Sequence, residues 1–93
     1  MRTIEFTGQF KRDYKRESKG AHKKTLAKDL NDVLKLLRAE KKLPEKYHDH
    51  PLVGDWKDHR DCHIKPDLVL IYRQPDKITL QLVRLGSHSQ LGI

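Results

Sequence analysis

The stretch that decides the fold is residues 68–86, which read LVLIYRQPDKITLQLVRLG. Its first five residues are continuously apolar, which is typical of a central strand buried on both faces. The QPDK segment that follows predicts a turn. Apolar residues then alternate with polar ones until Val83, where the parity shifts and indicates a β-bulge, and Gly86 ends the strand. The stretch therefore predicts two strands joined by a tight turn.

Two more strands are expected just upstream of this stretch. Residues 52–57 and 60–64 have a strand-like pattern and are predicted to pair as a hairpin through Asp58 and His59. Residues 65–67, Lys-Pro-Asp, then make the turn into the central strand. The second half of the chain is therefore predicted to be a meander of four strands.

The N-terminal segment predicts a strand followed by a helix. Residues 3–7 alternate and are rich in β-branched side chains, so Ile4 and Phe6 are expected to face the core. Thr7 is placed to cap the helix that follows, and a Gly-containing break at residues 18–20 ends that helix.

The clearest periodicity lies in residues 21–40. Leucine and valine recur there at helical spacing and form one apolar stripe, at Leu26, Leu30, Val33, Leu34 and Leu37. The outer face of this helix is basic, which suits either a solvated surface or one that meets RNA or a protein partner. The element order is thus β-α-α-β-β-β-β. It predicts one α+β domain over residues 1–93, a small antiparallel sheet with an αα-hairpin packed on one face.

The composition favours an anionic partner. The net charge is +7, and residues 1–46 carry 14 Lys and Arg against seven Asp and Glu. One cysteine excludes an intrachain disulfide, and no apolar run is long enough to span a membrane. No secretory leader is recognisable at the N-terminus, so a soluble cytoplasmic protein with no membrane contact is expected.

Residues 47–67, YHDHPLVGDWKDHRDCHIKPD, reverse this charge balance and hold four of the six histidines. Their spacing matches no strong zinc motif, so we expect neither a metal nor another cofactor. Imidazoles can instead act as acid and base near neutral pH. Cleavage of RNA needs only such groups, because the ribose 2′-OH can attack its own 3′-phosphate. Whether the histidines and aspartates converge cannot be derived from their spacing.

Several residues of this region have plainer interpretations. His48 is expected at the surface, and His59 in an exposed turn. Trp56 is expected to pack on the sheet rather than to stack on a base, and Cys62 to fill space beside a strand.

Longer segments of the chain strongly resemble the YafQ branch of the RelE-like bacterial toxins. The matching pieces are HDHPLVGDWKDHRDCHIKPDLVLIY and LVRLGSHSQL, with IEFTGQFKRDYK near the N-terminus. The likeness covers essentially the whole chain. It implies a RelE-like fold and a ribosome-dependent mRNA endonuclease, the toxin of a type II toxin–antitoxin pair. The implied partners are a cognate antitoxin, the ribosome and mRNA, with operon DNA bound only through the antitoxin complex.

The resemblance also implies a catalytic set. Carried over position by position, it falls on His50, His63, Asp67 and His88. His88 is then the general acid, His50 or Asp67 the general base, and His63 an orienting or stabilising group.

Two arginines and the C-terminus complete the interpretation. Arg84 is the first candidate to stabilise charge on the phosphate and Arg60 the second, although a structural ion pair with an aspartate fits Arg60 nearly as well. Many relatives carry an aromatic residue at the position of Gly92. Its absence leaves an alternative, a catalytically weak relative that mainly binds antitoxin and operon DNA.

Overall fold

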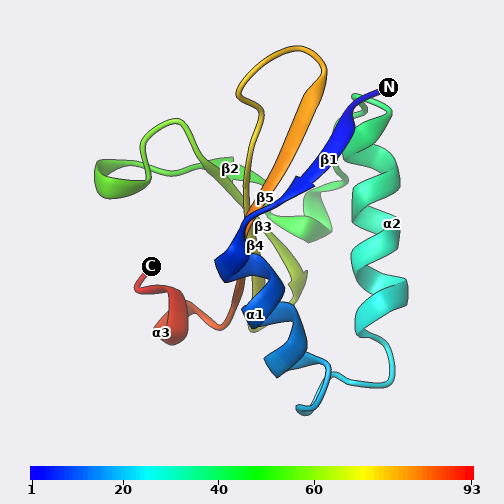
Figure 1. Cartoon of the computed structure of the whole chain (residues 1–93), viewed down its shortest axis with the longest axis vertical. Coiled ribbons are helices and arrows are strands. Elements are labelled where there is room, and N and C mark those ends of the chain that lie inside the picture. Colours follow the sequence, from blue (N-terminus) through cyan, green and yellow to red (C-terminus); the bar gives the residue numbers. More distant parts are fainter.

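The computed structural model describes all residues 1–93 (Figure 1). The elements in chain order are β1 (Thr3–Phe6), α1 (Gly8–Glu17), α2 (Leu26–Arg38), η1 (Glu45–Tyr47), β2 (His50–Pro51), η2 (Gly54–Trp56), β3 (Arg60–Lys65), β4 (Leu68–Arg73), β5 (Thr79–Gly86) and α3 (His88–Leu91). The predicted α+β order is confirmed, and a short C-terminal helix is added to it.

The five strands form one sheet in the order β1-β5-β4-β3-β2. The pairs β3–β4 and β4–β5 are antiparallel, as predicted, and β2 also pairs antiparallel with β3, although β2 is not the segment predicted to do so. The edge strand β1 instead pairs in parallel with β5, with Thr3 opposite Thr79 and Phe6 opposite Leu82. The sheet is therefore mixed rather than purely antiparallel, because β5, which returns to lie beside β1, runs in the same direction as β1.

The predicted central hairpin is confirmed in detail. All but the last residue of β4 are buried. The pairing of β4 with β5 shifts register between Ile71 and Tyr72, which leaves Val83 as the extra residue opposite them. This bulge turns Val83 toward one face of the sheet while Leu82 and Leu85 remain in the main core.

The two long helices cover one face of the sheet (Figure 1). The five stripe residues of α2 are all buried, together with Phe10 of α1 and side chains of β3, β4 and β5. Thr7 caps α1, with its Oγ1 accepting a hydrogen bond from the Phe10 N–H at 3.0 Å, as predicted. The main core thus lies between the αα-hairpin and the sheet.

Three local predictions are wrong, two in the bounds of an element and one in the burial of Phe6. Residues 52–57 do not form a strand, since Gly54 and Asp58 have φ of +67° and +68°, outside the extended region, and β2 is only His50–Pro51. Helix α2 starts at Leu26 rather than at residue 21, because none of residues 21–25 has a buried side chain to hold it in a helix. Phe6 is 49% exposed, at the end of an edge strand.

The second face of the sheet is partly covered. Val69 and Ile71 of β4 pack there with Leu91 of α3, and with Leu52 and Trp56 from the irregular segment after β2. Trp56 therefore packs on the sheet, as expected. No helix of the chain is long and apolar enough to cross a membrane.

Candidate functional site

The candidate site lies on this second face of the sheet, and β3 forms its floor. Asp61 and His63 are two residues apart on β3, so their side chains point to the same face as Val69 and Ile71 opposite them. Asp61 is only 2% exposed, whereas His63 is half-buried. Burial raises the pKa of Asp61, and the charges of neighbouring histidines partly offset that effect.

His50 joins the site through the pairing of β2 with β3, which sets it opposite Asp61. Its Nε2 lies 3.0 Å from Asp61 Oδ1, and its Nδ1 lies 2.8 Å from the His48 carbonyl oxygen. A carbonyl only accepts, so Nδ1 carries a proton that it donates to His48. Asp61 Oδ1 is buried and accepts no hydrogen bond, so its contact with Nε2 is an ion pair only when the His50 ring is protonated.

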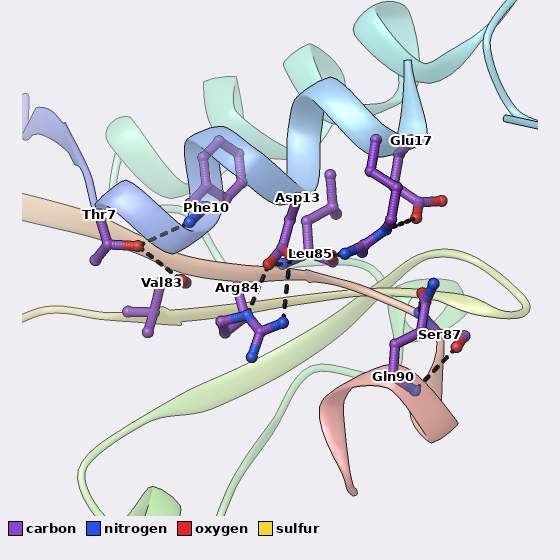
Figure 2. A network of polar contacts seen from close by, with 10 residues as sticks. Thr7, Phe10, Asp13, Glu17, Val83, Arg84, Leu85, Ser87 and Gln90 are labelled. Carbon is purple, nitrogen blue, oxygen red and sulfur yellow. Dashed lines mark hydrogen bonds and ion pairs between the residues drawn. The ribbon is translucent and has the colours of Figure 1, made fainter. Parts of the chain in front are cut away.

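His88 reaches the site from the first turn of α3. Ser87 caps this helix: its Oγ accepts from the Gln90 N–H, and Gln90 Oε1 accepts from the Ser87 N–H (Figure 2). The cap fixes the position of His88 just after the end of β5. Its Nδ1 lies 3.3 Å from Asp67 Oδ1, in the turn between β3 and β4. An imidazole held at Nδ1 by a carboxylate keeps its Nε2 free for proton transfer.

Three imidazole rings form a row across the site. The ring centroids of His48 and His63 are 5.2 Å apart, and those of His63 and His88 are 5.0 Å apart. His48 is at the surface, as expected, but its contact with His63 was not foreseen. Its backbone is left-handed, with φ of +49°, and this conformation turns the side chain toward β3. No pattern of residue types signals such a turn.

Asp61 was also missed as a site residue, although a signal for it was present. Alternation along a strand places residues 61 and 63 on the same face. Any strand that presents His63 to the site therefore presents Asp61 as well. The histidine and aspartate residues inferred from the resemblance, His50, His63, Asp67 and His88, lie on one face with Asp61 and His48 added.

The surroundings of His63 predict how it titrates. Burial and the charge of His88 lower its pKa. We expect its ring protons to titrate by NMR with a midpoint below the ordinary value of about 6.5. Replacing His88 with glutamine removes the second cause and leaves the first. The midpoint should then rise but stay below the ordinary value, and a midpoint at or above it in the wild type would contradict this account.

The two arginines lie in ion pairs. Arg60 points to the opposite face from Asp61 and binds Asp49 through Nε at 3.3 Å and Nη2 at 3.1 Å, which is the structural pairing weighed for it. Arg84 binds Asp13 of α1 through Nε at 2.7 Å and Nη2 at 3.2 Å (Figure 2). The structure thus does not bring Arg60 together with the histidines, and it commits most of the Arg84 guanidinium to Asp13.

Cys62 is buried in the main core, and burial raises the pKa of its thiol, so it fills space as expected. Across residues 1–93, no group of three or more His, Cys, Asp or Glu side chains is arranged to hold a metal ion.

Known proteins resemble this chain over almost its whole length. The mRNA interferase toxin YafQ of Escherichia coli K12 is 40% identical over 91 residues, which cover 98% of this chain and 96% of that protein. A crystal structure of the E. coli DinJ–YafQ complex matches with a TM-score of 0.78 and 37% identity, covering 98% of each chain. A metal-bound toxin from Helicobacter pylori matches with a TM-score of 0.81 and 45% identity, covering 98% of this chain and 99% of that one.

A family model gives the same assignment. The model described as a bacterial toxin of type II toxin–antitoxin system, YafQ, matches residues 2–92. With a 40% identical relative covered almost end to end, this match settles the family. The chain belongs to the YafQ family of bacterial toxins of type II toxin–antitoxin systems.

Proposed function

We propose that this chain is an endoribonuclease that cuts mRNA on the translating ribosome, using the 2′-OH of the substrate as nucleophile. The observation that carries the proposal is the site itself, where two histidine–aspartate pairs flank a third histidine on one open face. The E. coli relative is named as an mRNA interferase, which agrees with this chemistry. Because the proposed substrate is mRNA under translation, the proposed reaction takes place in the cytoplasm.

In the proposed reaction, the 2′-oxygen attacks the adjoining phosphorus as it loses its proton to a base. The bond from phosphorus to the 5′-oxygen breaks, and an acid protonates that oxygen. The products are a 2′,3′-cyclic phosphate and a 5′-hydroxyl. Each well-placed acid or base contributes roughly 10²–10⁴-fold.

His88 is the proposed acid. Asp67 holds its Nδ1 at 3.3 Å, and its Nε2 is left to protonate the 5′-oxygen. Attack and departure occur on opposite sides of the phosphorus, so the base must lie across the site from His88. Asp67 touches His88 and lies on the same side. His50, on β2 at the far edge of β3, is therefore the better base, and His63 lies between the two as an orienting group.

In the proposed step His50 starts neutral and takes the 2′-OH proton. The Asp61 carboxyl, 3.0 Å from Nε2, then faces the positive charge that forms on the ring. The predicted phosphate-binding role of Arg84 stays a prediction, with Nη1 as the nitrogen that Asp13 leaves unbound.

This mechanism predicts the effect of an Asp61→Asn variant on the cleavage rate. Asparagine keeps the shape of the side chain but removes the negative charge that faces protonated His50, so kcat on translating ribosomes should fall. The loss should be smaller than the roughly 10²–10⁴-fold expected when the base itself is replaced in His50→Gln. An unchanged rate for both variants would exclude His50 as the base.

The proposal also includes two partners, the ribosome and a cognate antitoxin. Fourteen Lys and Arg in residues 1–46 supply salt-dependent attraction for ribosomal RNA phosphates. The E. coli relative forms a complex with DinJ, so we propose an antitoxin partner for this chain too, with operon DNA bound through that complex.

The proposed function is tested by mapping mRNA 5′ ends after brief induction of the toxin. A reporter with an intact start codon should show new ends in frame with its codons. The same reporter with the start codon destroyed should show none. Equal cutting of both reporters would show that the ribosome is not required.

A further inference from the structure

A cleft of about 480 Å³ adjoins the catalytic histidines between α2, η1 and β3. It is bordered on one side by Lys46, Tyr47 and His48, and on the other by His63 and the end of β3. Its volume falls within the ~300–1,000 Å³ of small-ligand sites. Since His48 and His63 belong both to the cleft and to the row of imidazoles, a ligand in the cleft lies directly beside the reacting groups.

The charges of the cleft leave one cation without an acidic partner. Lys28 pairs with Asp32 at 3.1 Å, and Lys65 pairs with Asp29. Lys46 forms no salt bridge, and its Nζ lies 5.0 Å from the centre of the Tyr47 ring. An exposed ammonium without a carboxylate partner is suited to one phosphate group.

Tyr47 supplies a fixed aromatic surface in the same cleft. Its ring is half-buried and packs against the main core, so it loses little freedom when a ligand binds. Aromatic rings of this kind stack on the bases of single-stranded nucleic acids. Residues 89–93, beside His88, contain no aromatic side chain.

We propose that this cleft binds the mRNA nucleotide next to the scissile phosphate, with its base on the Tyr47 ring and its own phosphate at Lys46. The Lys46 ammonium now covers that ring, so it moves to the phosphate as the base takes its place. The inference rests on the proposed function, because it names a subsite of that same reaction. His48 and His63 then border both the bound nucleotide and the bond to be cut.

The test uses a single-stranded trinucleotide whose sugars are all 2′-deoxyribose. It lacks the attacking hydroxyl and therefore cannot be cleaved by the proposed reaction. Its affinity for the full chain is measured by NMR titration over a series of salt concentrations. Lys46→Gln should reduce the slope of log K against log salt by about 0.7, the loss of one single-strand phosphate contact. Lys77→Gln, the same change in the β4–β5 turn at the other end of the sheet, should leave the slope unchanged.

A second variant tests the aromatic surface. Tyr47→Leu keeps an apolar side chain against the core but removes the stacking ring. It should weaken trinucleotide binding about tenfold, from the ~1–3 kcal/mol that a base–aromatic stack contributes. Its thermal unfolding curve, compared with that of the wild type, checks that the fold is intact.

The outcomes separate this inference from the proposed function. The subsite alone is overturned if the wild type cuts mRNA, Lys46→Gln keeps the full salt slope, and the trinucleotide changes NMR signals only outside the cleft. If the trinucleotide changes NMR signals within the cleft but the protein cuts no mRNA, the nucleotide site stands and the nuclease is overturned. Absence of trinucleotide shifts in the cleft overturns the subsite in either case.

Discussion

Replacing His88 with glutamine is expected to slow mRNA cleavage by about 10²–10⁴-fold, the contribution of one general acid. Glutamine fills similar space and still hydrogen-bonds, but it cannot deliver a proton to the 5′-oxygen. The capping box of Ser87 and Gln90 does not involve the His88 side chain, so α3 should remain in place. The rate is measured with purified protein on translating ribosomes, and growth arrest after induction gives the matching readout in cells.

The matched control for this change is His22→Gln. His22 lies in the turns between α1 and α2, on the helix-covered side and outside the row of imidazoles. This variant should cleave mRNA and arrest growth like the wild type. If His88→Gln arrested growth as strongly as the wild type, toxicity would come from binding rather than cleavage, and the alternative of a weak relative would be favoured.

Replacing Asp13 with asparagine is expected to lower the free energy of unfolding by about 3 kcal/mol, at the lower end of the range for breaking a buried ion pair. Asp13 is 3% exposed and joins α1 to β5 (Figure 2). Its carboxylate accepts from Arg84, from Arg16 at 2.9 Å and from the Leu85 N–H at 3.0 Å. Asparagine keeps the shape but leaves the Arg84 guanidinium without its counter-charge, whereas Arg16 keeps its ion pair with Glu17 at 2.9 Å.

The control for this variant is Asp32→Asn, which makes the same chemical change in an exposed ion pair. Lys28 and Asp32 are neighbours on the surface of α2, with side chains 77% and 44% exposed. Such i,i+4 pairs contribute about 0.3–0.5 kcal/mol. Urea unfolding of the two variants should therefore give clearly different losses. A loss below 1 kcal/mol for Asp13→Asn would mean that the network contributes little.

The effect of Asp13 should also depend on pH. Burial opposes its ionisation, but the hydrogen bonds from Arg84 and Leu85 outweigh burial and hold its pKa below 3.8. A carboxyl with a depressed pKa contributes stability that is present above its unfolded pKa and lost as the pH falls through its folded pKa. The difference in stability between Asp13→Asn and the wild type should therefore shrink in strongly acidic solution.

The helices and the central hairpin were predictable because local periodicity specifies them. The stripe of α2 and the parity shift at Val83 both depend on neighbours in sequence. The parallel pairing of β1 was not predictable, since it joins residues 3–6 to residues 79–82 and nothing in either segment selects the direction. The strand predicted at residues 52–57 fails for a local reason: the backbone is left-handed at Gly54 and at Asp58, the residue that follows the segment.

The site was predictable in its residue types but not in its contacts. The resemblance supplied His50, His63, Asp67 and His88. The partner of His50 depends on the register of β2, which is only two residues long. The position of His48 depends on one left-handed residue. Periodicity reveals neither feature, whereas Asp61 was within reach from strand alternation alone.

The central claim is that the substrate provides its own nucleophile and the histidines move the protons. The most direct measurement is cleavage of an mRNA that carries a single 2′-deoxyribose at the nucleotide before the cut, on translating ribosomes and with EDTA-treated toxin. The account predicts that the unmodified message is cut to a cyclic phosphate and a 5′-hydroxyl, and that the modified message is not cut at that position. Cleavage of both messages at the same rate, with 5′-phosphate ends, would contradict it.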